Sequence, residues 1–273
     1  MRVLFITQKV DRNDDLLGVY HDWIAELAKH VERVVVICLM KGAVALPKNV
    51  EVHSLGKENT KSRIRWLWNF FKHIVALRKH YDAVFVHMNT IYVLLGWWLW
   101  ALLRKPVVLW FAHYRPNWQL KFANLVVARI VTSVPEACAI RSEKVIAIGQ
   151  GIDTERFVKS NERGVKSNGA IKLLFLGRIS PIKDLETLIR AANLLRSRGL
   201  EFQLNIVGSP TDKDAAHYER IKRLVEEFNL SRTINFMNRV PNRETPAIYA
   251  DHDLFVNLTA TGSFDKSILE AMA

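Results

Sequence analysis

Short apolar runs rich in β-branched residues alternate with segments of helical periodicity along nearly the whole chain, and this alternation most constrains the fold. Residues 3–7 and 34–39 are two such runs, and an amphipathic segment at 20–30 separates them. Continuous apolar strands that alternate with helices are typical of a parallel sheet covered on both faces. The pattern therefore predicts an α/β protein. Further strands are expected at 50–55, 83–87, 107–111, 130–134 and 145–148, and further helices at 64–80, 91–103 and 118–128.

The alternation is interrupted once, by the polar segment 158–170, which contains two glycines and no apolar period. Such a segment is typical of a linker. The pattern then restarts, so we predict two Rossmann-like domains, 1–157 and 171–273. The last expected helix begins near Lys266 and has no cap, Gly or Pro stop, so the second domain is expected to be incomplete. Its expected strands are 171–176, 202–207, 233–236 and 254–257, and its other helices are 185–197, 215–228 and 244–250.

The net charge and the composition limit the classes of molecule that this protein is expected to bind. The net charge of +12 favours an anionic partner. No zinc-ligand spacing or RNA-binding aromatic motif is present, so we expect no nucleic acid partner. Cys38 and Cys138 lie in or beside apolar runs and are expected to be reduced and buried. The longest uncharged apolar run, 91–103, has 13 residues, fewer than the roughly 20 that span a bilayer. With no secretory signal at the N-terminus, a cytoplasmic protein is expected.

Ligands of open α/β sheets bind at the carboxyl ends of the strands, so the loops after strands are the places to search. The most informative loop is 177–184. Gly177 permits a tight turn, Arg178 and Lys183 bring two cations, and the following helix supplies free amides. This combination suits a diphosphate, because Arg can bind two oxygens and Lys acts as a point charge. The alternative is a solvated basic loop.

Two further loops carry weaker signals. Gly208 follows the next strand, where a glycine commonly means only a tight turn. The loop at 259–265 enters a helix, and its small and hydroxyl residues can present amides to an anion or a sugar. Glu270, one turn into that helix, can accept hydrogen bonds from a ribose diol, although a solvated surface position is the alternative. The residues of this loop and helix start that we consider are Gly262, Ser263, Phe264, Asp265 and Lys266.

Taken in order, these motifs resemble family 4 glycosyltransferases of the GT-B fold. The resemblance rests on 177–183, 207–208, 254–258 and the closing segment 269–273. In the first domain, 148–157 matches the segment with which that family leaves its N-terminal domain, and His113 matches the family's histidine after a strand. The resemblance extends over nearly the whole chain, and the ordered set of motifs is specific where no single one is.

The resemblance implies a GT-B fold, with two Rossmann-like parallel-sheet domains facing a cleft. It also implies a retaining enzyme that moves a hexose-type sugar from a nucleotide-diphosphate sugar. Arg178 and Lys183 would contact the diphosphate and stabilise the charge of the leaving nucleotide without a metal or other cofactor. Glu270 would hold the ribose. His113 would hydrogen-bond the donor sugar as a third catalytic residue, the alternative being a satisfied buried histidine. The donor-binding set is Gly177, Arg178, Lys183, Gly208, Gly262, Ser263, Phe264, Asp265, Lys266 and Glu270.

Two positions depart from the family pattern. Gly262 stands where the family usually has a Glu that contacts the donor sugar, so Asp265 or Lys266 would take over that contact. The first turn lacks the family's frequent Gly-Gly pair, and only Gly18 suits close approach to an acceptor or phosphate. The rival hypothesis is therefore a non-catalytic nucleotide-sugar or anion-binding module. The segment 251–253 resembles the Asp-x-Asp metal motif of another glycosyltransferase fold, but it begins a strand, which favours a structural boundary.

The segment 61–80 combines cations with aromatic residues. A basic aromatic helix suits a membrane interface, whereas the alternative is that the aromatic face packs on the sheet. We interpret the segment as docking the first domain on the inner leaflet, where the acceptor is a glycan or lipid-linked molecule of cell-envelope polysaccharide or glycolipid synthesis. The residues concerned are Arg63, Arg65, Trp66, Trp68, Phe70, Phe71, Lys72, Arg78 and Lys79, with Trp97, Trp98, Trp100, Arg104 and Lys105 as a second group.

Overall fold

The structure is a computed structural model of the 273-residue chain and describes residues 1–113, 115, 117–157, 170–259 and 265–273. It divides into two compact units, each with its own parallel sheet. The first is Met1–Gln150, and the second begins at Gly151. Nearly all of the expected linker 158–170, together with Gly262, Ser263 and Phe264, lies outside the described residues.

The first unit is a seven-stranded parallel sheet in the order β3-β2-β1-β4-β5-β6-β7. The order reverses at β1, so the carboxyl ends of β1 and β4 form the switch point at which ligands of such sheets bind. The strands are β1 (Arg2–Val10), β2 (Arg33–Lys41), β3 (Val50–Ser54), β4 (Ala83–His87), β5 (Val107–Trp110), β6 (Arg129–Thr132) and β7 (Val145–Ala147).

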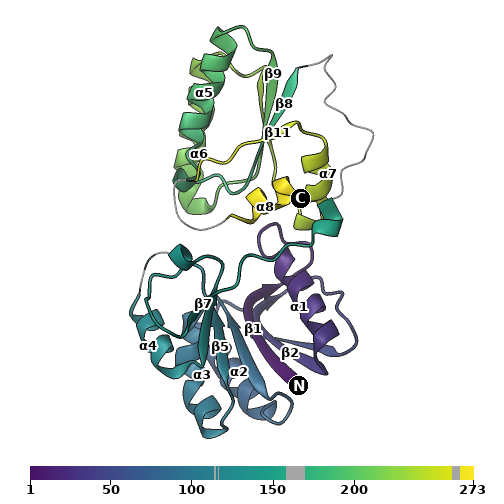
Figure 1. The fold of residues 1–273 in the computed structure, drawn as a ribbon, viewed down its shortest axis with the longest axis vertical. Helices are drawn as coiled ribbons and strands as arrows, with labels where there is room; N and C mark the ends of the chain where they lie inside the picture. Colours follow the sequence, from purple (N-terminus) through teal and green to yellow (C-terminus); the bar gives the residue numbers. More distant parts are fainter. Residues whose placement is uncertain (114, 116, 158–169, 260–264) are drawn as a thin grey trace. The chain divides into compact units, whose positions relative to one another are not determined.

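Helices cover both faces of this sheet, as the apolar strands predict. Ile24 and Ala28 of α1 (Gly18–His30) pack on one face. The other three helices, α2 (Arg63–Ala76), α3 (Thr90–Leu102) and α4 (Trp118–Val126), pack on the opposite face in one layer. Figure 1 shows α1 and this layer on opposite sides of the sheet.

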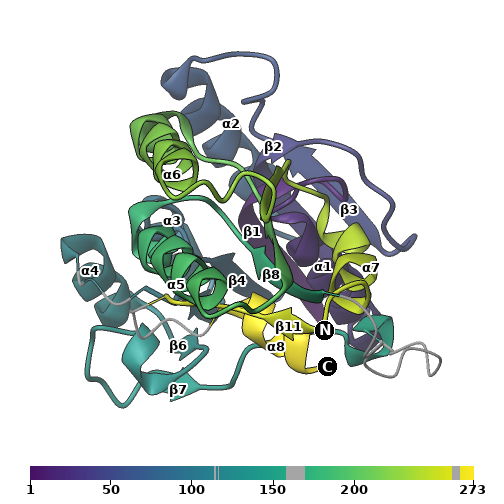
Figure 2. The same cartoon turned by 90° about the horizontal axis from the view of Figure 1, so that it is seen from above.

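The second unit contains a parallel sheet in the order β10-β9-β8-β11. The buried residues of α5 follow the i, i+3, i+4, i+7 spacing of an amphipathic helix. Figure 2 shows α5 beside α6, with α7 on the other side of β8. The strands are β8 (Ile171–Leu176), β9 (Phe202–Val207), β10 (Ile234–Met237) and β11 (Leu254–Phe255), and the helices are α5 (Leu185–Ser197), α6 (Ala215–Glu227), α7 (Thr245–Ala250) and α8 (Lys266–Met272).

The segment 151–157 differs from its expected place at the end of the first domain. It packs on the second unit instead, through a short 3-10 helix at Thr154–Phe157. The Phe157 ring lies 5.9 Å from that of Tyr249, measured between centroids. Arg156 donates to the backbone carbonyl of Asn242 at 3.2 Å. These contacts give the segment a docking place on α7.

The environment of the two cysteines agrees with the expectation from the sequence. Cys38 and Cys138 are both free and buried, and burial raises the pKa of the Cys38 thiol to about 12. The prediction of reduced structural thiols is therefore confirmed. In the part of the chain that the structure describes, no helix is both long and apolar enough to cross a bilayer.

Candidate functional site

Three loops of the second unit meet at the carboxyl edge of its sheet. Gly177 and Arg178 follow β8, Gly208 follows β9, and Thr259 comes shortly after β11. Because β8 pairs with both β9 and β11 in parallel, the loops that leave these strands lie at the same edge. The structure thus brings together the described parts of the three loops that the sequence singles out.

Gly208 is required by a close approach between two of these loops. A Cβ atom at this position would lie 1.9 Å from the backbone carbonyl oxygen of Gly177. Backbone hydrogen bonding between the two segments also continues past the ends of β8 and β9, since the Ile179 N–H donates to the Ser209 carbonyl at 3.2 Å. The glycine is therefore more than a generic turn residue, because no side chain fits between the loops.

Arg178 is exposed on this fixed backbone. The next residue, Ile179, is fully buried and pairs with Pro210 in an isolated bridge, which holds the loop in place. Within the described residues, no carboxylate forms an ion pair with Arg178. Its guanidinium is consequently available to a ligand.

Lys183 has a different environment, because its side chain is only 15% exposed. Its ammonium donates to the Thr259 hydroxyl at 3.0 Å and forms an ion pair with Asp265. The alternative of a solvated basic loop is therefore wrong for Lys183 and holds only for Arg178. The loop after β8 presents one exposed cation and one buried, paired cation.

Asp265 is the centre of a small hydrogen-bond network. Its Oδ2 accepts from Asn257 at 3.0 Å and from the Thr259 hydroxyl at 2.9 Å, in addition to Lys183. Burial alone would raise the pKa of this carboxyl, but Lys183 and the hydrogen bonds outweigh burial and hold it below its usual range. Asp265 is therefore ionised at neutral pH. No donor among the described residues reaches its second oxygen, Oδ1.

Glu270 is buried, with only 5% of its surface exposed. Its Oε1 accepts from Asn242 at 3.1 Å, and its Oε2 accepts from the Tyr249 hydroxyl at 3.1 Å. The alternative of a solvated surface carboxylate is therefore wrong. Burial, followed by the charge of Glu270, raises the pKa of Tyr249 above its ordinary value, so the hydroxyl stays a donor. The two partners fix the carboxylate on α8.

Sequence interpretation did not predict the four residues that orient these carboxylates, although Thr259 lies in a loop that it singled out. Asn257 and Thr259 come shortly after β11, and polar residues just past the end of a strand are the signal that identifies them in the sequence. Asn242 and Tyr249 carry no such signal, since they lie at the start and on the inner side of α7. Their role depends on contacts between distant segments.

Lys266 begins α8, one turn before Glu270. Its Nζ is shielded from solvent. This burial lowers the pKa of the Lys266 ammonium to about 7, although the carboxylate of Glu270 opposes the shift. At neutral pH the group is therefore close to the midpoint of its titration. A bound anion would raise the pKa again and draw a proton to Lys266.

This shift predicts the pH dependence of stability. The folded protein binds fewer protons than the unfolded chain between pH 7 and 10.5, so Lys266 destabilises the fold below this window and ceases to do so as the pH rises through it. Lys266→Met is expected to stabilise the protein at pH 7. The gain should shrink towards pH 9 by at most about 1.4 kcal/mol per pH unit. Urea unfolding at both pH values measures it, with the exposed Lys213→Met as control. A gain independent of pH would contradict the assignment.

The segment Asp251-His252-Asp253 is structural. The Asp253 carboxylate accepts from the Lys172 backbone at 2.8 Å, and Asp251 pairs with the Lys172 side chain at 3.2 Å. The two ring nitrogens of His252 lie within hydrogen-bond distance of Ile248 and Asn205. The prediction of a structural boundary is confirmed. The described residues contain no cluster of three or more His, Cys, Asp or Glu side chains that suits a metal ion.

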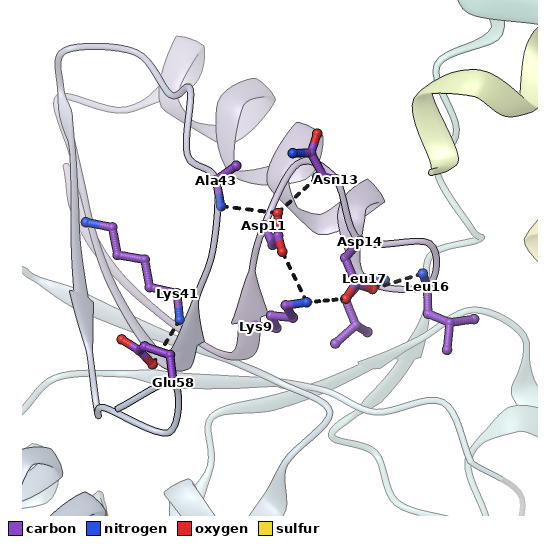
Figure 3. A network of polar contacts seen from close by, with 9 residues as sticks. All are labelled: Lys9, Asp11, Asn13, Asp14, Leu16, Leu17, Lys41, Ala43 and Glu58. Carbon is purple, nitrogen blue, oxygen red and sulfur yellow. Dashed lines mark hydrogen bonds and ion pairs between the residues drawn. The ribbon is translucent and has the colours of Figure 1, made fainter. Parts of the chain in front are cut away.

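In the first unit, the loop between β1 and α1 is held together by ion pairs among its own charged residues (Figure 3). Lys9 contacts Asp14 at 2.5 Å and Asp11 at 3.1 Å. Burial would raise the pKa of each carboxyl, but Lys9 and backbone N–H groups lower it overall. The remaining carboxylate oxygens accept from the backbone N–H groups of Asn13, Ala43, Leu16 and Leu17.

This loop leaves little room for an anion. Asp14 accepts the amides of Leu16 and Leu17, which directly precede α1, and the N-cap residue Leu17 provides no side-chain cap. A carboxylate thus already lies close to this helix N-terminus, where its charge disfavours a second anion. Gly18 is buried, and a Cβ there would meet the Arg12 carbonyl at 3.5 Å. This is an ordinary van der Waals distance, so the packing of the loop does not require a glycine here, and contact with an acceptor stays a prediction.

His113 lies just after β5 and is exposed. Its Nδ1 accepts from the Arg115 backbone N–H at 3.1 Å, and its backbone pairs with Cys138. The alternative of a satisfied core histidine is therefore wrong. Two described histidines of this unit are buried, His21 on α1 and His87 at the end of β4. His87 lies 3.2 Å from the Thr7 hydroxyl. His87 and Thr7 place a polar pair at the switch point, a pair that sequence interpretation missed.

The fold and this site define a class of protein: two parallel-sheet units of the GT-B type, the second with cations and fixed carboxylates at its strand ends. Residues 170–273 match the family model described as glycosyl transferases group 1. The sequence resemblance to this group is confirmed, and so is the fold class.

Relatives and solved structures agree with this family. The chain is 25% identical over 174 residues to the putative colanic acid biosynthesis glycosyltransferase WcaL of Salmonella typhimurium, covering 59% of this chain and 41% of that protein. It is 27% identical over 139 residues to D-inositol 3-phosphate glycosyltransferase 2 of Catenulispora acidiphila, covering 48% and 33%. The matched stretch thus spans less than half of either relative.

Among solved structures, Anabaena Alr3699/HepE in complex with UDP and glucose superposes with a TM-score of 0.76. The match covers 100% of this chain and 78% of that one, at 17% identity. At this identity the likeness establishes the fold alone. The relatives and the matching family are all glycosyltransferases.

Proposed function

We propose that the protein is a retaining glycosyltransferase. It transfers a hexose-type sugar from a nucleotide-diphosphate sugar to a glycan or lipid-linked acceptor in cell-envelope polysaccharide or glycolipid synthesis. The observation that carries the proposal is the pair of cations after β8, with Arg178 exposed and Lys183 held by Asp265 at the same sheet edge. The colanic acid relative and the neighbour crystallised with UDP and glucose support the choice of donor and product class.

The donor diphosphate binds Arg178 and Lys183 in this proposal. Arg178 has an unpaired planar fork among the described residues and can hold two phosphate oxygens. The Lys183 ammonium has three N–H groups, of which two reach Thr259 and Asp265, so one remains for phosphate. As the sugar departs, negative charge grows on the diphosphate and these fixed cations stabilise it. No metal or other cofactor is required for this role.

The two fixed carboxylates bind the sugars of the donor. Each oxygen of Glu270 accepts one protein hydrogen bond and keeps a second lone pair for a ribose hydroxyl. The Oδ1 of Asp265 accepts a hydroxyl of the transferred sugar and replaces the acid that the family usually has at Gly262. His113 donates to the same sugar. The remaining donor-side contacts are those of Gly177, Gly208, Gly262, Ser263, Phe264 and Lys266.

On the acceptor side we place Gly18 and the β1–α1 loop. The ion pairs of Lys9 with Asp11 and Asp14 favour an acceptor that offers hydroxyl groups over one that offers a phosphate at this loop. We place the enzyme in the cytoplasm, peripheral on the inner face of the membrane, where lipid-linked acceptors are found. Nucleic acid is not a partner in this proposal.

One rival function follows from a specific position. Gly262 replaces the acid that usually contacts the donor sugar, which favours a non-catalytic module that binds a nucleotide-sugar or another anion. The two functions differ in one measurement, the release of nucleotide diphosphate in the presence of acceptor. Binding of UDP-glucose without release, across a panel of lipid-linked and glycan acceptors, supports the rival.

Donor binding itself is tested with Arg178→Ala. Loss of a charge-assisted contact to phosphate is expected to weaken UDP-glucose binding by about tenfold to a hundredfold, equivalent to about 1.5–3 kcal/mol. Isothermal calorimetry and the ligand-induced shift in melting temperature measure this. The matched control is Arg223→Ala, an exposed arginine on α6 away from the strand ends. Equal affinities of wild type and Arg178→Ala would refute the assignment.

A further inference from the structure

Helix α2 carries two apolar stripes, and folding uses only one of them. Phe70 and Ile74 are fully buried against the sheet. The second stripe is Ile64, Trp68 and Val75, which are 81%, 71% and 40% exposed, with Leu67 beside it at 41%. The spacing of i, i+4 and i+11 puts these residues on one side of the helix, turned away from Phe70 and Ile74. The packing interpretation of the basic aromatic segment therefore holds for Phe70 and Ile74, whereas Ile64 and Trp68 are exposed and the membrane interpretation of the segment stays a prediction.

The neighbouring helix α3 extends this apolar surface. It contains no charged residue, and its inner side is buried in the same core as that of α2. Its outer side exposes Ile91, Trp98 and Leu102, at 41%, 45% and 75%. Their spacing of i, i+7 and i+11 forms one stripe. The two helices are in contact and lie in one layer over the sheet (Figure 1).

Cations surround the two stripes and acids are nearly absent. Residues 59–135 contain 11 Lys and Arg residues and a single acid, Asp82. That acid is bound to Arg2 at 2.7 Å. The segment 61–80 contains no acid, and six of its cations are exposed: Lys61, Arg63, Arg65, Lys72, Arg78 and Lys79.

We propose that the outer face of α2 and α3 docks on a bilayer that contains anionic lipids. Helix α2 lies in the plane of the interface, with Ile64, Trp68 and Leu102 inserted among the upper acyl carbons. The lysine and arginine heads reach back to lipid phosphates. The indole N–H of Trp98 donates to the Leu95 carbonyl at 2.9 Å, so its 45% exposed ring adds apolar surface to this face.

Charge decides between a bilayer and other occupants. A second copy of this chain would bring two surfaces of the same sign together, which is unfavourable. A nucleic acid would satisfy the cations but leave the aliphatic side chains of Ile64, Leu67 and Leu102 without a partner. An anionic bilayer satisfies both sets. This inference rests on the membrane association proposed above and assigns it to the outer face of α2 and α3. The vesicle experiment that tests it does not depend on sugar transfer.

Vesicle sedimentation tests the surface, with phosphatidylcholine vesicles compared with vesicles that contain 30% phosphatidylglycerol. The wild type is expected to partition at least tenfold more strongly onto the anionic vesicles. Ile64→Ser/Trp68→Ser should lose at least tenfold of this binding. Arg65→Gln/Lys72→Gln should lose most of the preference for anionic lipid. Leu194→Ser, which changes a 53% exposed apolar residue on α5, and Lys213→Gln are the controls and should bind as the wild type does.

All four variants change exposed side chains, and unchanged melting temperatures show that they fold. Equal wild-type partitioning onto neutral and anionic vesicles overturns the proposal, as does undiminished binding of Ile64→Ser/Trp68→Ser. Two other outcomes also overturn it. In the first, the wild type is a dimer and Ile64→Ser/Trp68→Ser is a monomer. In the second, a short oligonucleotide displaces the wild type from the vesicles and binds it more tightly than the vesicles do. Because no donor is present, failure of sugar transfer leaves the vesicle result unaffected.

Discussion

Replacing Lys183 by alanine is expected to lower the rate of sugar transfer by about a hundredfold to a thousandfold, the usual effect of removing one fixed group that stabilises transition-state charge. The Lys183 side chain is only 15% exposed, and Asp265 and Thr259 hold its ammonium in place. A fixed cation needs no reorganisation as charge develops on the leaving diphosphate. The turnover number at saturating UDP-glucose is the measurement that isolates this effect.

The single variant also leaves the Asp265 carboxylate without its cation, so loss of activity can arise from loss of stability. The double variant Lys183→Ala/Asp265→Asn separates the two causes. It removes both charges and keeps the hydrogen bonds that the amide can make with Asn257 and Thr259. We expect it to unfold near the wild-type temperature and to remain inactive. A double variant that regains turnover would show that Lys183 acts only in folding.

Asp265 adds a pH signature to this pair. Its carboxyl has a lowered pKa in the folded protein, so the pair stabilises the fold above the ordinary carboxyl range and the stabilisation is lost as the pH falls through the folded value. The acid limb of the stability profile should therefore be flatter in the double variant than in the wild type. This comparison identifies the ion pair without any activity measurement.

The sheets could be predicted from the sequence because their signal is local. Each strand is a run of apolar residues: β2, for example, has Val34, Val35 and Val36 all fully buried. Parallel order then follows from the alternation with helices, and the convergence of loops follows from parallel order. For this reason Gly177, Arg178 and Gly208 could be placed at one edge before any coordinates were known.

The partners of the site residues could not be predicted in this way. Lys183 and Asp265 are 82 residues apart, and Glu270 lies 28 residues from Asn242. No periodicity links such positions, so a solvated and a buried Glu270 look the same in sequence. The same limit applies to α2, where spacing reveals two apolar stripes and only the packing of the layer tells which one faces the sheet.

The second large effect is expected for Gly208→Ala, which should lower the free energy of unfolding by about 2–4 kcal/mol, since overpacking against immovable neighbours costs 1–3 kcal/mol or more. The added Cβ would lie 1.9 Å from the Gly177 carbonyl oxygen, a backbone atom that cannot rotate away. The loops after β8 and β9 must separate to admit it, and this breaks the bond between Ile179 and Ser209.

The matched control is Gly151→Ala, because a Cβ at Gly151 meets nothing within 4 Å. It should change the stability by less than about 0.5 kcal/mol. Separation of the loops also displaces Arg178, so Gly208→Ala should bind UDP-glucose more weakly even at temperatures where it is fully folded. Urea unfolding and calorimetry on the same preparations measure both effects. Wild-type stability in Gly208→Ala would mean that the two loops do not approach as described, and wild-type donor affinity would mean that their spacing does not position Arg178.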